Sequence, residues 1–432
     1  MVTRAMFSGV SGLRAEGEAL GVVGDNIANV NTVGFKSQRA VFQDVLGHSI
    51  LAGTSSALPG SGVRVGDVQQ LFTQGSISNT GVSTDVALNG DGFLVVAGTV
   101  DGITSNFFTR AGQFTIDNDG FLVNQQQLNV QGYIANADGT LQAAVSDLAV
   151  PTSSLAPFST TEITITANLD SRDAENLLTF DVTNPAGTAN GTTSITVFDS
   201  LGTARTLDIY FNAVGGNLYE YNVVADGAEL AGGTAGVDQL LSTGTLQFTS
   251  DGALDTATTP QLALSFAGGA TAGQLIDLNF GDDILTDGST GLAGTTQFAS
   301  DTAVSSQSQD GFASGEFSGL AIDGTGLVQG LYTNGQKITI GQLAVAKFRS
   351  NDGLGRAGQN LWIETRDSGT AALGAAGAGG RASVSAGALE SSNVDLGEEF
   401  VGLIQHQRSF SANSRTITTA DEMLQELINI KR

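Results

Sequence analysis

The C-terminal stretch, residues 396–432, repeats its apolar side chains every seven residues, and this repeat restricts the chain more than any other feature. Steps of alternately four and three residues give a seam with seven apolar members out of ten: Leu396, Phe400, Leu403, Gln407, Phe410, Ser414, Ile417, Asp421, Leu424 and Ile428. Such spacing is typical of a coiled-coil helix. Its three polar members recur one heptad apart. This repeat predicts a partner helix whose contact surface is hydrated or rich in small residues.

A second seam with the same spacing lies at the N-terminus, where a helix is expected over about Thr3–Asn29. Its members are Met6, Val10, Leu13, Gly17, Leu20, Gly24 and Ile27. Each glycine costs about 1 kcal/mol of helix propensity, so their regular placement predicts the close approach of another helix. We therefore expect the two ends of the chain to pair. The alternative is that two ordinary amphipathic helices pack on one globular core.

The energetics of the C-terminal helix favour assembly over a self-contained fold. Its predicted start carries the capping residues Ser392, Asn393 and Asp395. Burial of one apolar seam offsets only part of the conformational entropy that the helix loses when its backbone becomes ordered. We therefore expect the terminal helices to order only when neighbouring copies cover their remaining faces.

Composition excludes several kinds of chemistry. The 432 residues include no cysteine and only two histidines, His48 and His406, so disulfides, zinc–thiolate sites and cysteine nucleophiles are excluded. No convergent nucleophile–base pair or phosphate-binding loop is found, and we expect no enzyme activity and no cofactor. No apolar run is long enough to span a membrane, and the N-terminus is not predicted to be a cleavable signal.

The net charge of −25 is concentrated in the middle of the chain. Residues 111–336 contain 25 acidic residues and two basic ones, Arg172 and Arg205, and so carry −23. A nucleic-acid partner is not expected, because phosphate binding needs clusters of lysine and arginine. The acidic middle is expected to face solvent, while the nearly neutral ends can pack against copies of themselves.

Two short strings near the ends are the most specific in the sequence. In ANVNTVGFK, residues 28–36, the side chains of Asn29, Asn31 and Thr32 can bond free backbone groups at a helix end. Gly34 can adopt the left-handed conformation that closes a helix, and Phe35 can anchor the turn on a neighbouring surface. The second string comprises QRSFSANSR, residues 407–415, and TADEMLQ, residues 419–425.

Both strings resemble the terminal signatures of the bacterial flagellar axial proteins, the rod and hook family. Many relatives have Ala-Tyr-Gln where this chain has Ser409-Phe410-Ser411, a change that keeps the ring but loses its hydroxyl. The seams and this resemblance together predict the subunit-interaction residues Met6, Val10, Leu13, Leu20, Ile27, Asn29, Asn31, Thr32, Gly34, Phe35, Leu396, Phe400, Leu403, Gln407, Phe410, Asn413, Ile417, Leu424 and Ile428.

The chain between the ends is predicted to be mainly β. Residues 114–116 are expected to pair with residues 121–123 across a tight turn. As an EF-hand calcium loop, the string that starts at Asp117 would need an oxygen ligand at its fifth position and glutamate at its twelfth. Phe121 and Leu128 stand there, so a hairpin turn is expected and no metal site.

Residues 150–302 alternate apolar and polar side chains, as in Ile163, Ile165, Ala167 and Leu169. A period of two predicts an antiparallel β-sandwich or barrel. The strings NLDS, residues 168–171, and FDSLG, residues 198–202, resemble hook members of the axial family. The shorter rod proteins have little or no domain here, and this difference favours a hook protein over a distal-rod protein.

The predicted fold class is mainly β with terminal α-helices and nested, discontinuous domains. Residues 1–36 and 390–432 form a coiled-coil-like helical domain that lines an inner tube and is disordered in the monomer. Residues 37–70 and 369–389 are connectors, with 369–380 flexible. Residues 71–149 and 303–368 form an inner β domain, and residues 150–302 form an outer acidic β sandwich or barrel.

The resemblance implies a structural subunit that polymerises with itself into a flexible hollow tube, a universal joint that transmits torque from rod to filament. It also implies contacts with flagellar rod, hook-cap and hook–filament junction proteins, and export through the flagellar type III apparatus to the extracellular hook. No direct membrane insertion is expected. The alternatives are a distal-rod or hook-associated flagellar protein and, in another class, an acidic β-rich cell-surface adhesin.

Overall fold

The computed structural model describes residues 2–46, 60–136, 138–176 and 178–430. It divides into a first unit, Met1–Thr152, Gly319–Leu331 and Lys337–Arg432, and a second unit, Ser153–Ser318 and Tyr332–Gln336. The chain leaves the first unit, builds the second and returns. The second unit extends beyond residue 302, the predicted boundary, because β19 (Ala303–Gln309) pairs antiparallel with β11 (Glu162–Asn168).

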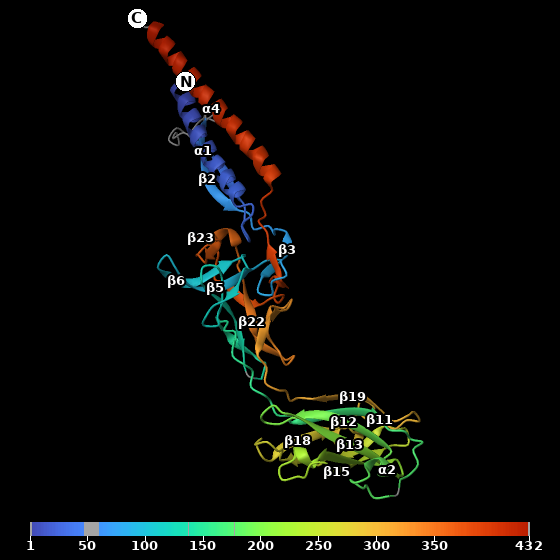
Figure 1. Ribbon diagram of the computed structural model, residues 1–432. Helices are drawn as coiled ribbons and strands as arrows, with labels where there is room; N and C mark the ends of the chain where they lie inside the picture. The colour runs from blue at the N-terminus through green and yellow to red at the C-terminus, as the bar shows by residue number, and fades with distance from the viewer. Residues whose placement is uncertain (1, 47–59, 137, 177, 431–432) are drawn as a thin grey trace. The chain divides into compact units, whose positions relative to one another are not determined.

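Two long helices and a long hairpin form the terminal part of the first unit (Figure 1). Helices α1 (Val2–Ala28) and α4 (Leu396–Ile430) confirm both predicted helices. Strands β1 (Gln38–Leu46) and β2 (Gly60–Gln70) pair antiparallel, and both contact α1. The connector predicted for residues 37–70 is therefore wrong where these strands lie. Val63 and Val65 alternate with polar residues, a period that suits a strand with one covered face.

A 12-stranded sheet forms the β part of the first unit, with the main path β20–β21–β22–β9–β5–β6–β24–β23. Its strands are β5 (Phe93–Val100), β6 (Ile103–Thr109), β7 (Thr115–Ile116), β8 (Leu122–Val123), β9 (Asn129–Ala135), β10 (Leu141–Asp147), β20 (Phe317–Ile322), β21 (Leu327–Tyr332), β22 (Lys337–Lys347), β23 (Gly355–Gly358), β24 (Leu361–Ile363) and β25 (Ala372–Ala375). Its core packs aromatic rings edge to face, with Phe108 and Phe348 centred 4.7 Å apart. Trp362 belongs to the same cluster.

Three short strand pairings involve residues 369–389, for which the sequence predicts a connector. Strand β25 pairs with β22, β26 (Ser383–Ala386) with β4 (Val86–Asn89), and β27 (Ala388–Glu390) with β3 (Ile77–Asn79). The prediction of a connector is wrong where these strands lie, and the prediction of flexibility for residues 369–380 is wrong at β25. The glycines and alanines make room for Arg381, whose guanidinium donates to the carbonyl oxygens of Ala372 and Leu373 at 3.1 and 2.9 Å.

The hairpin predicted at residues 114–123 is confirmed. Thr115 pairs with Val123 and Ile116 with Leu122. The Asp117 carboxylate accepts the backbone N–H groups of Asp119 and Phe121 at 3.0 and 2.7 Å. The Asp117 side chain therefore stabilises the turn by accepting backbone N–H groups two and four residues later, as aspartate commonly does in turns.

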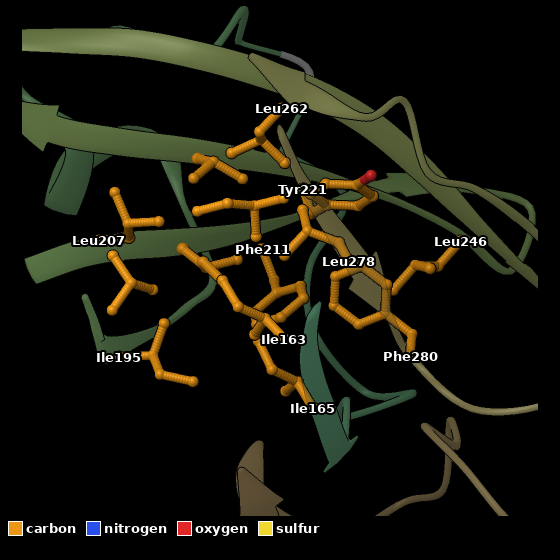
Figure 2. Packing of buried hydrophobic residues seen from close by; sticks show 14 of the residues in the cluster. Ile163, Ile165, Ile195, Leu207, Phe211, Tyr221, Leu246, Leu262, Leu278 and Phe280 are labelled. Carbon is orange, nitrogen blue, oxygen red and sulfur yellow. The ribbon is translucent and has the colours of Figure 1, made fainter. Parts of the chain in front are cut away.

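The second unit is a sandwich of a five-stranded and a four-stranded sheet. The first has the order β12–β13–β14–β15–β16 and the second β17–β18–β11–β19. The elements not yet placed are α2 (Pro185–Thr188), β12 (Gly191–Phe198), β13 (Ala204–Gly215), β14 (Leu218–Asp226), β15 (Asp238–Phe248), β16 (Leu254–Thr258), β17 (Leu262–Leu264), β18 (Gln274–Asn279) and α3 (Ile284–Asp287). Figure 2 shows their shared core, where Ile163 and Leu278 of one sheet meet Phe211 and Tyr221 of the other.

One strand pair departs from the expected antiparallel arrangement. Strands β11 and β18 run parallel, with Ile163 opposite Leu278. The whole five-stranded sheet lies between them in the sequence, and so long a crossover permits the parallel direction. The sandwich itself is confirmed, because side chains of both sheets fill one core.

A buried carboxylate pairs with an arginine in the second unit. Asp199 accepts the backbone N–H groups of Leu201 and Thr203, both at 2.9 Å, and the Arg205 guanidinium at 3.2 Å. Burial by itself raises the pKa of Asp199, but these donors outweigh it and hold the pKa below its usual range. The ionised form therefore belongs to the folded state.

We expect the second unit to lose stability at acid pH, and the variant Asp199→Asn to lose less. A carboxyl whose folded-state pKa is depressed stabilises above its unfolded pKa of about 4, and this contribution disappears as pH falls through the lower folded value. Denaturant unfolding from pH 7 to pH 3, followed by tyrosine absorbance, measures the effect. The exposed Asp238→Asn variant is the control. If Asp199→Asn lost as much stability at acid pH as the unaltered chain, the stabilising role assigned to the ionised Asp199 carboxylate would be contradicted.

Candidate subunit-interaction site

The two terminal helices pair with each other, as the two seams predict, and their directions are antiparallel. Asn26 of α1 donates to Glu399 of α4 at 2.8 Å, and Glu16 lies 2.6 Å from the His406 ring nitrogen. An added Cβ at Gly9 would lie 2.9 Å from Ile417. Residue numbers thus fall along α1 as they rise along α4. The two ends of the chain thus form one helix pair, visible in Figure 1 as the adjoining blue and red helices.

The seam predicted on α4 is only half correct. Leu403, Ile417 and Leu424 are half-buried on the side of α4 that meets α1, whereas the predicted member Phe410 is exposed. The other covered positions of α4 lie one residue earlier than predicted. These covered positions hold Glu399, His406, Asn413 and Ala420. The predicted members Gln407, Ser414 and Asp421 are exposed. The reason is hydrogen bonding, because Glu399 and His406 both have polar partners on α1.

The close approach predicted at Gly17 and Gly24 is wrong within the chain. Among the described residues, an added Cβ at either glycine would meet no atom within 4 Å. The tight positions are Gly9 and Gly12, and an added Cβ at Gly12 would lie 2.6 Å from the Asn413 side chain. Small residues on α1 therefore receive the polar Asn413 side chain. The polar seam members for which the sequence predicts a small-residue partner are instead exposed.

Much of both predicted seams stays uncovered in the single chain. On α1, Met6 is exposed and Val10, Leu13, Leu20 and Ile27 are half-buried. On α4, the side chains of the predicted members Leu396, Phe400 and Phe410 are 40 to 52% exposed, and those of Val401, Ile404 and Met423, outside the predicted seam, are 45 to 56% exposed. Ile428 lies in a part of α4 whose side chains are outside the described residues. Contiguous apolar side chains at a surface mark a contact site.

The string at residues 28–36 folds as a capped turn. Asn29 donates to the Asp25 carbonyl oxygen at 2.9 Å, and Thr32 donates to the Asn29 side chain at 3.1 Å. Gly34 has φ +69°, the predicted left-handed conformation. Asn31 is exposed, while Phe35 is buried within its own chain. The turn directs residues 35–38 into the β part of the first unit.

Sequence reasoning missed a buried charge cluster beyond this turn. Lys36 Nζ lies 2.6 Å from Glu390 Oε1, and Arg110 Nη1 lies 3.2 Å from Glu390 Oε2. The side chains of Lys36 and Glu390 are 0% exposed. Lys36 also donates to the Thr73 carbonyl oxygen at 2.7 Å. One carboxylate therefore joins the segment after α1, the segment before α4 and the β sheet.

The charge cluster holds two cations against one anion. Burial lowers the pKa of Lys36, the Glu390 carboxylate raises it and Arg110 lowers it, and the balance lies below the usual lysine value. Glu390 also accepts the Gly75 backbone N–H at 2.9 Å. The stability of this junction therefore depends on Glu390 more than on either cation.

Asp395 and Asn393, both predicted as capping residues of α4, play different roles. Asp395 caps the helix, because its carboxylate accepts the N–H groups of Gly397 and Glu398 at 2.7 and 3.3 Å. Asn393, which the sequence predicts as another cap, instead accepts the Ser37 backbone N–H and donates to the Leu71 carbonyl oxygen. It ties the entry of α4 to the segments that flank the β1–β2 hairpin.

Four family models match successive parts of the chain. They are described as flagella basal body rod protein at residues 6–36, flagellar hook protein FlgE/F/G D1 domain at 87–170, flagellar basal body protein FlaE D2 domain at 168–312, and flagellar basal body rod FlgEFG protein C-terminal at 385–430. The first and last contain most of α1 and of α4. The matched regions therefore cover both terminal helices and both units.

Full-length relatives support the same family. The flagellar hook protein FlgE of Salmonella typhimurium is 35% identical over 428 residues, 98% of each chain. That of Escherichia coli K12 is 35% identical over 433 residues, 99% of this chain and 100% of the relative. That of Borreliella burgdorferi is 32% identical over 454 residues, 99% of each.

The solved structures add a match in fold. The crystal structure of Helicobacter pylori flagellar hook protein FlgE2 aligns with a TM-score of 0.52 at 15% identity, and the alignment covers 71% of this chain and 98% of that one. The chain belongs to the flagellar hook protein family, whose members are structural subunits of the bacterial flagellum. Among the described residues, neither long helix is apolar enough to cross a membrane.

Proposed function

We propose that this hook-family subunit polymerises through its paired terminal helices into a flexible hollow tube that transmits torque from rod to filament. The supporting observation is that α1 and α4 pair with each other and still leave apolar side chains uncovered on both helices. Such a helix pair needs further copies to complete its burial. In the tube the helices line the channel, and the β units lie outside them.

The proposed partners follow from membership of the family. They are copies of the same chain, the flagellar rod, the hook cap, the hook–filament junction proteins and the type III export apparatus. No chemical reaction is part of this role. Bending is proposed to occur by small sliding steps between the outer β units, whose surfaces are rich in acidic residues.

Electron microscopy of the purified chain polymerised in vitro tests the proposed function. Short curved tubes are the expected product, because a universal joint must bend. Straight, rigid tubes would support the alternative of a distal-rod protein. Absence of any tube under conditions that keep the chain folded would contradict polymerisation by this chain alone.

Limited proteolysis of the monomer is expected to remove α1 and α4 before it cuts the β units. Among the described residues, α4 is covered along the side that meets α1, and α1 is covered by α4 and the β1–β2 hairpin, while many other side chains of both helices are exposed. Both helices should therefore open locally at low cost. The buried Lys36–Glu390 pair should protect the segments next to it. Mass spectrometry of the resistant fragment measures the outcome, with the polymer as the control. Helices that resist protease equally in monomer and polymer would contradict this prediction.

A further inference from the structure

An open groove of about 430 Å³ runs between α1 and the β1–β2 hairpin. Its apolar lining comes from both elements and comprises Phe7, Val10, Val45, Val63 and Val65. Phe7 is 73% exposed. Arg14, Arg64 and Glu18 also line the groove, and among the described residues neither arginine forms an ion pair. The groove is therefore apolar with a positive balance of charge.

A stripe of matching chemistry lies at the start of α4. It consists of the exposed side chains Leu396, Phe400, Val401 and Ile404. The stripe lies on the side of α4 turned away from α1, since α1 meets Glu399 and His406. The acidic residues Asp395 and Glu398 are exposed beside it. The stripe is therefore apolar with a negative balance of charge.

We infer that the groove of one copy binds the α4 stripe of a second copy. This inference rests on the proposed function and names the surfaces that carry out the polymerisation. Apolar side chains cover apolar side chains, and the acidic start of α4 meets the unpaired arginines of the groove. A second copy fits better than an unrelated partner, because each chain presents both halves of the contact.

The register of this interface follows from aligning the middle of the groove with the middle of the stripe, whose levels are given by contacts within one chain. Gly12, in the middle of the groove-lining stretch of α1, lies at the level of Asn413 on its own α4. The middle of the stripe, Phe400, lies 13 residues earlier on that helix. At 1.5 Å per residue the second copy is displaced by about 20 Å along the helix axis. The displacement brings Glu398 to the level of Arg14 and Ile404 to that of Phe7.

The groove and the stripe are different patches, so the contact is heterologous. Each copy offers its stripe to one neighbour and its groove to another. Repetition of such a contact gives an open helical array unless the rotation happens to close a ring. The geometry thus accounts for a tube that grows at its end and does not stop at a dimer.

Engineered cysteines test the contact cleanly, because the chain has none of its own. Full-length Phe7→Cys and Ile404→Cys chains are polymerised separately and as a mixture, and then oxidised. Cross-linked dimers are expected only in the mixture. The control mixture pairs Phe7→Cys with Leu285→Cys, an exposed residue of the second unit. Helical reconstruction of the unaltered polymer should show neighbours displaced by about 20 Å.

A charge exchange provides a second measurement. Glu398→Arg should reduce polymer yield, and adding Arg14→Glu to the same chain should restore it. Polymers that form without the Phe7–Ile404 cross-link, or a double variant no better than Glu398→Arg, would overturn this contact and leave the proposed function standing. Failure of the unaltered chain to polymerise would overturn the proposed function itself and this contact with it.

Discussion

Replacing Glu390 by glutamine is expected to destabilise the first unit by about 3 to 5 kcal/mol, the usual effect of breaking a buried ion pair. Lys36 and Arg110 would then remain buried without a countercharge. The loss should shrink as pH rises, because burial depresses the pKa of Lys36 and deprotonation in the folded state relieves the unpaired charge. The cluster thus links both chain ends to the β sheet energetically.

Tryptophan fluorescence measures this effect in the first unit alone. The chain has one tryptophan, Trp362, which is buried in the sheet core and donates to Gln70 at 2.8 Å. Denaturant unfolding followed at this residue should show a lower midpoint for Glu390→Gln. The exposed Glu422→Gln variant is the matched control. Equal midpoints for the two variants would show that the cluster contributes little.

Substituting Gly34 by alanine is expected to have the second largest effect. Its φ of +69° costs a residue with a Cβ about 1 to 2 kcal/mol. The added Cβ would also lie 2.6 Å from the backbone of both Arg110 and Ala111. Neither backbone atom can rotate away as a flexible side chain can, so the turn after α1 must shift and strain the neighbouring Lys36–Glu390 pair.

Gly17→Ala is expected to have the opposite effect. Gly17 lies within α1 with open space around its Cα among the described residues, and alanine is favoured over glycine there by about 1 kcal/mol. Helix content by circular dichroism should therefore rise or stay constant for Gly17→Ala. Gly34→Ala should lower the Trp362 unfolding midpoint. Equal Trp362 unfolding midpoints for the two variants would contradict the roles assigned to Gly34 and Gly17.

The sequence predicts the elements of this protein better than the faces through which they meet. Both helices, the hairpin at residues 114–123 and the sandwich follow from local periodicity. The α4 seam is half wrong because a search for apolar residues selects Phe400 over Glu399. The structure uses Glu399 and His406 because each has a hydrogen-bond partner on α1. Satisfied polar residues leave no signal in an apolar pattern.

The charge cluster shows a second limit of local reasoning. Glu390 is separated from Lys36 by 354 residues and from Arg110 by 280. Only the paired strands around them bring these charges together. Similarly, composition suggests a connector at residues 369–380, but Arg381 reaches across this segment and bonds its carbonyl oxygens. In both cases the structure depends on contacts between residues or strands that local sequence patterns do not reveal.

Assembly is proposed to be driven by the uncovered apolar side chains of the terminal helices. Sedimentation of full-length Phe400→Asp/Ile404→Asp polymers tests it directly, with Leu285→Asp, a residue 74% exposed in the second unit, as the control. We expect the helix variant to stay in the supernatant as a folded monomer while the control pellets like the unaltered chain. A helix variant that pellets at the same concentration as the unaltered chain would contradict the claim.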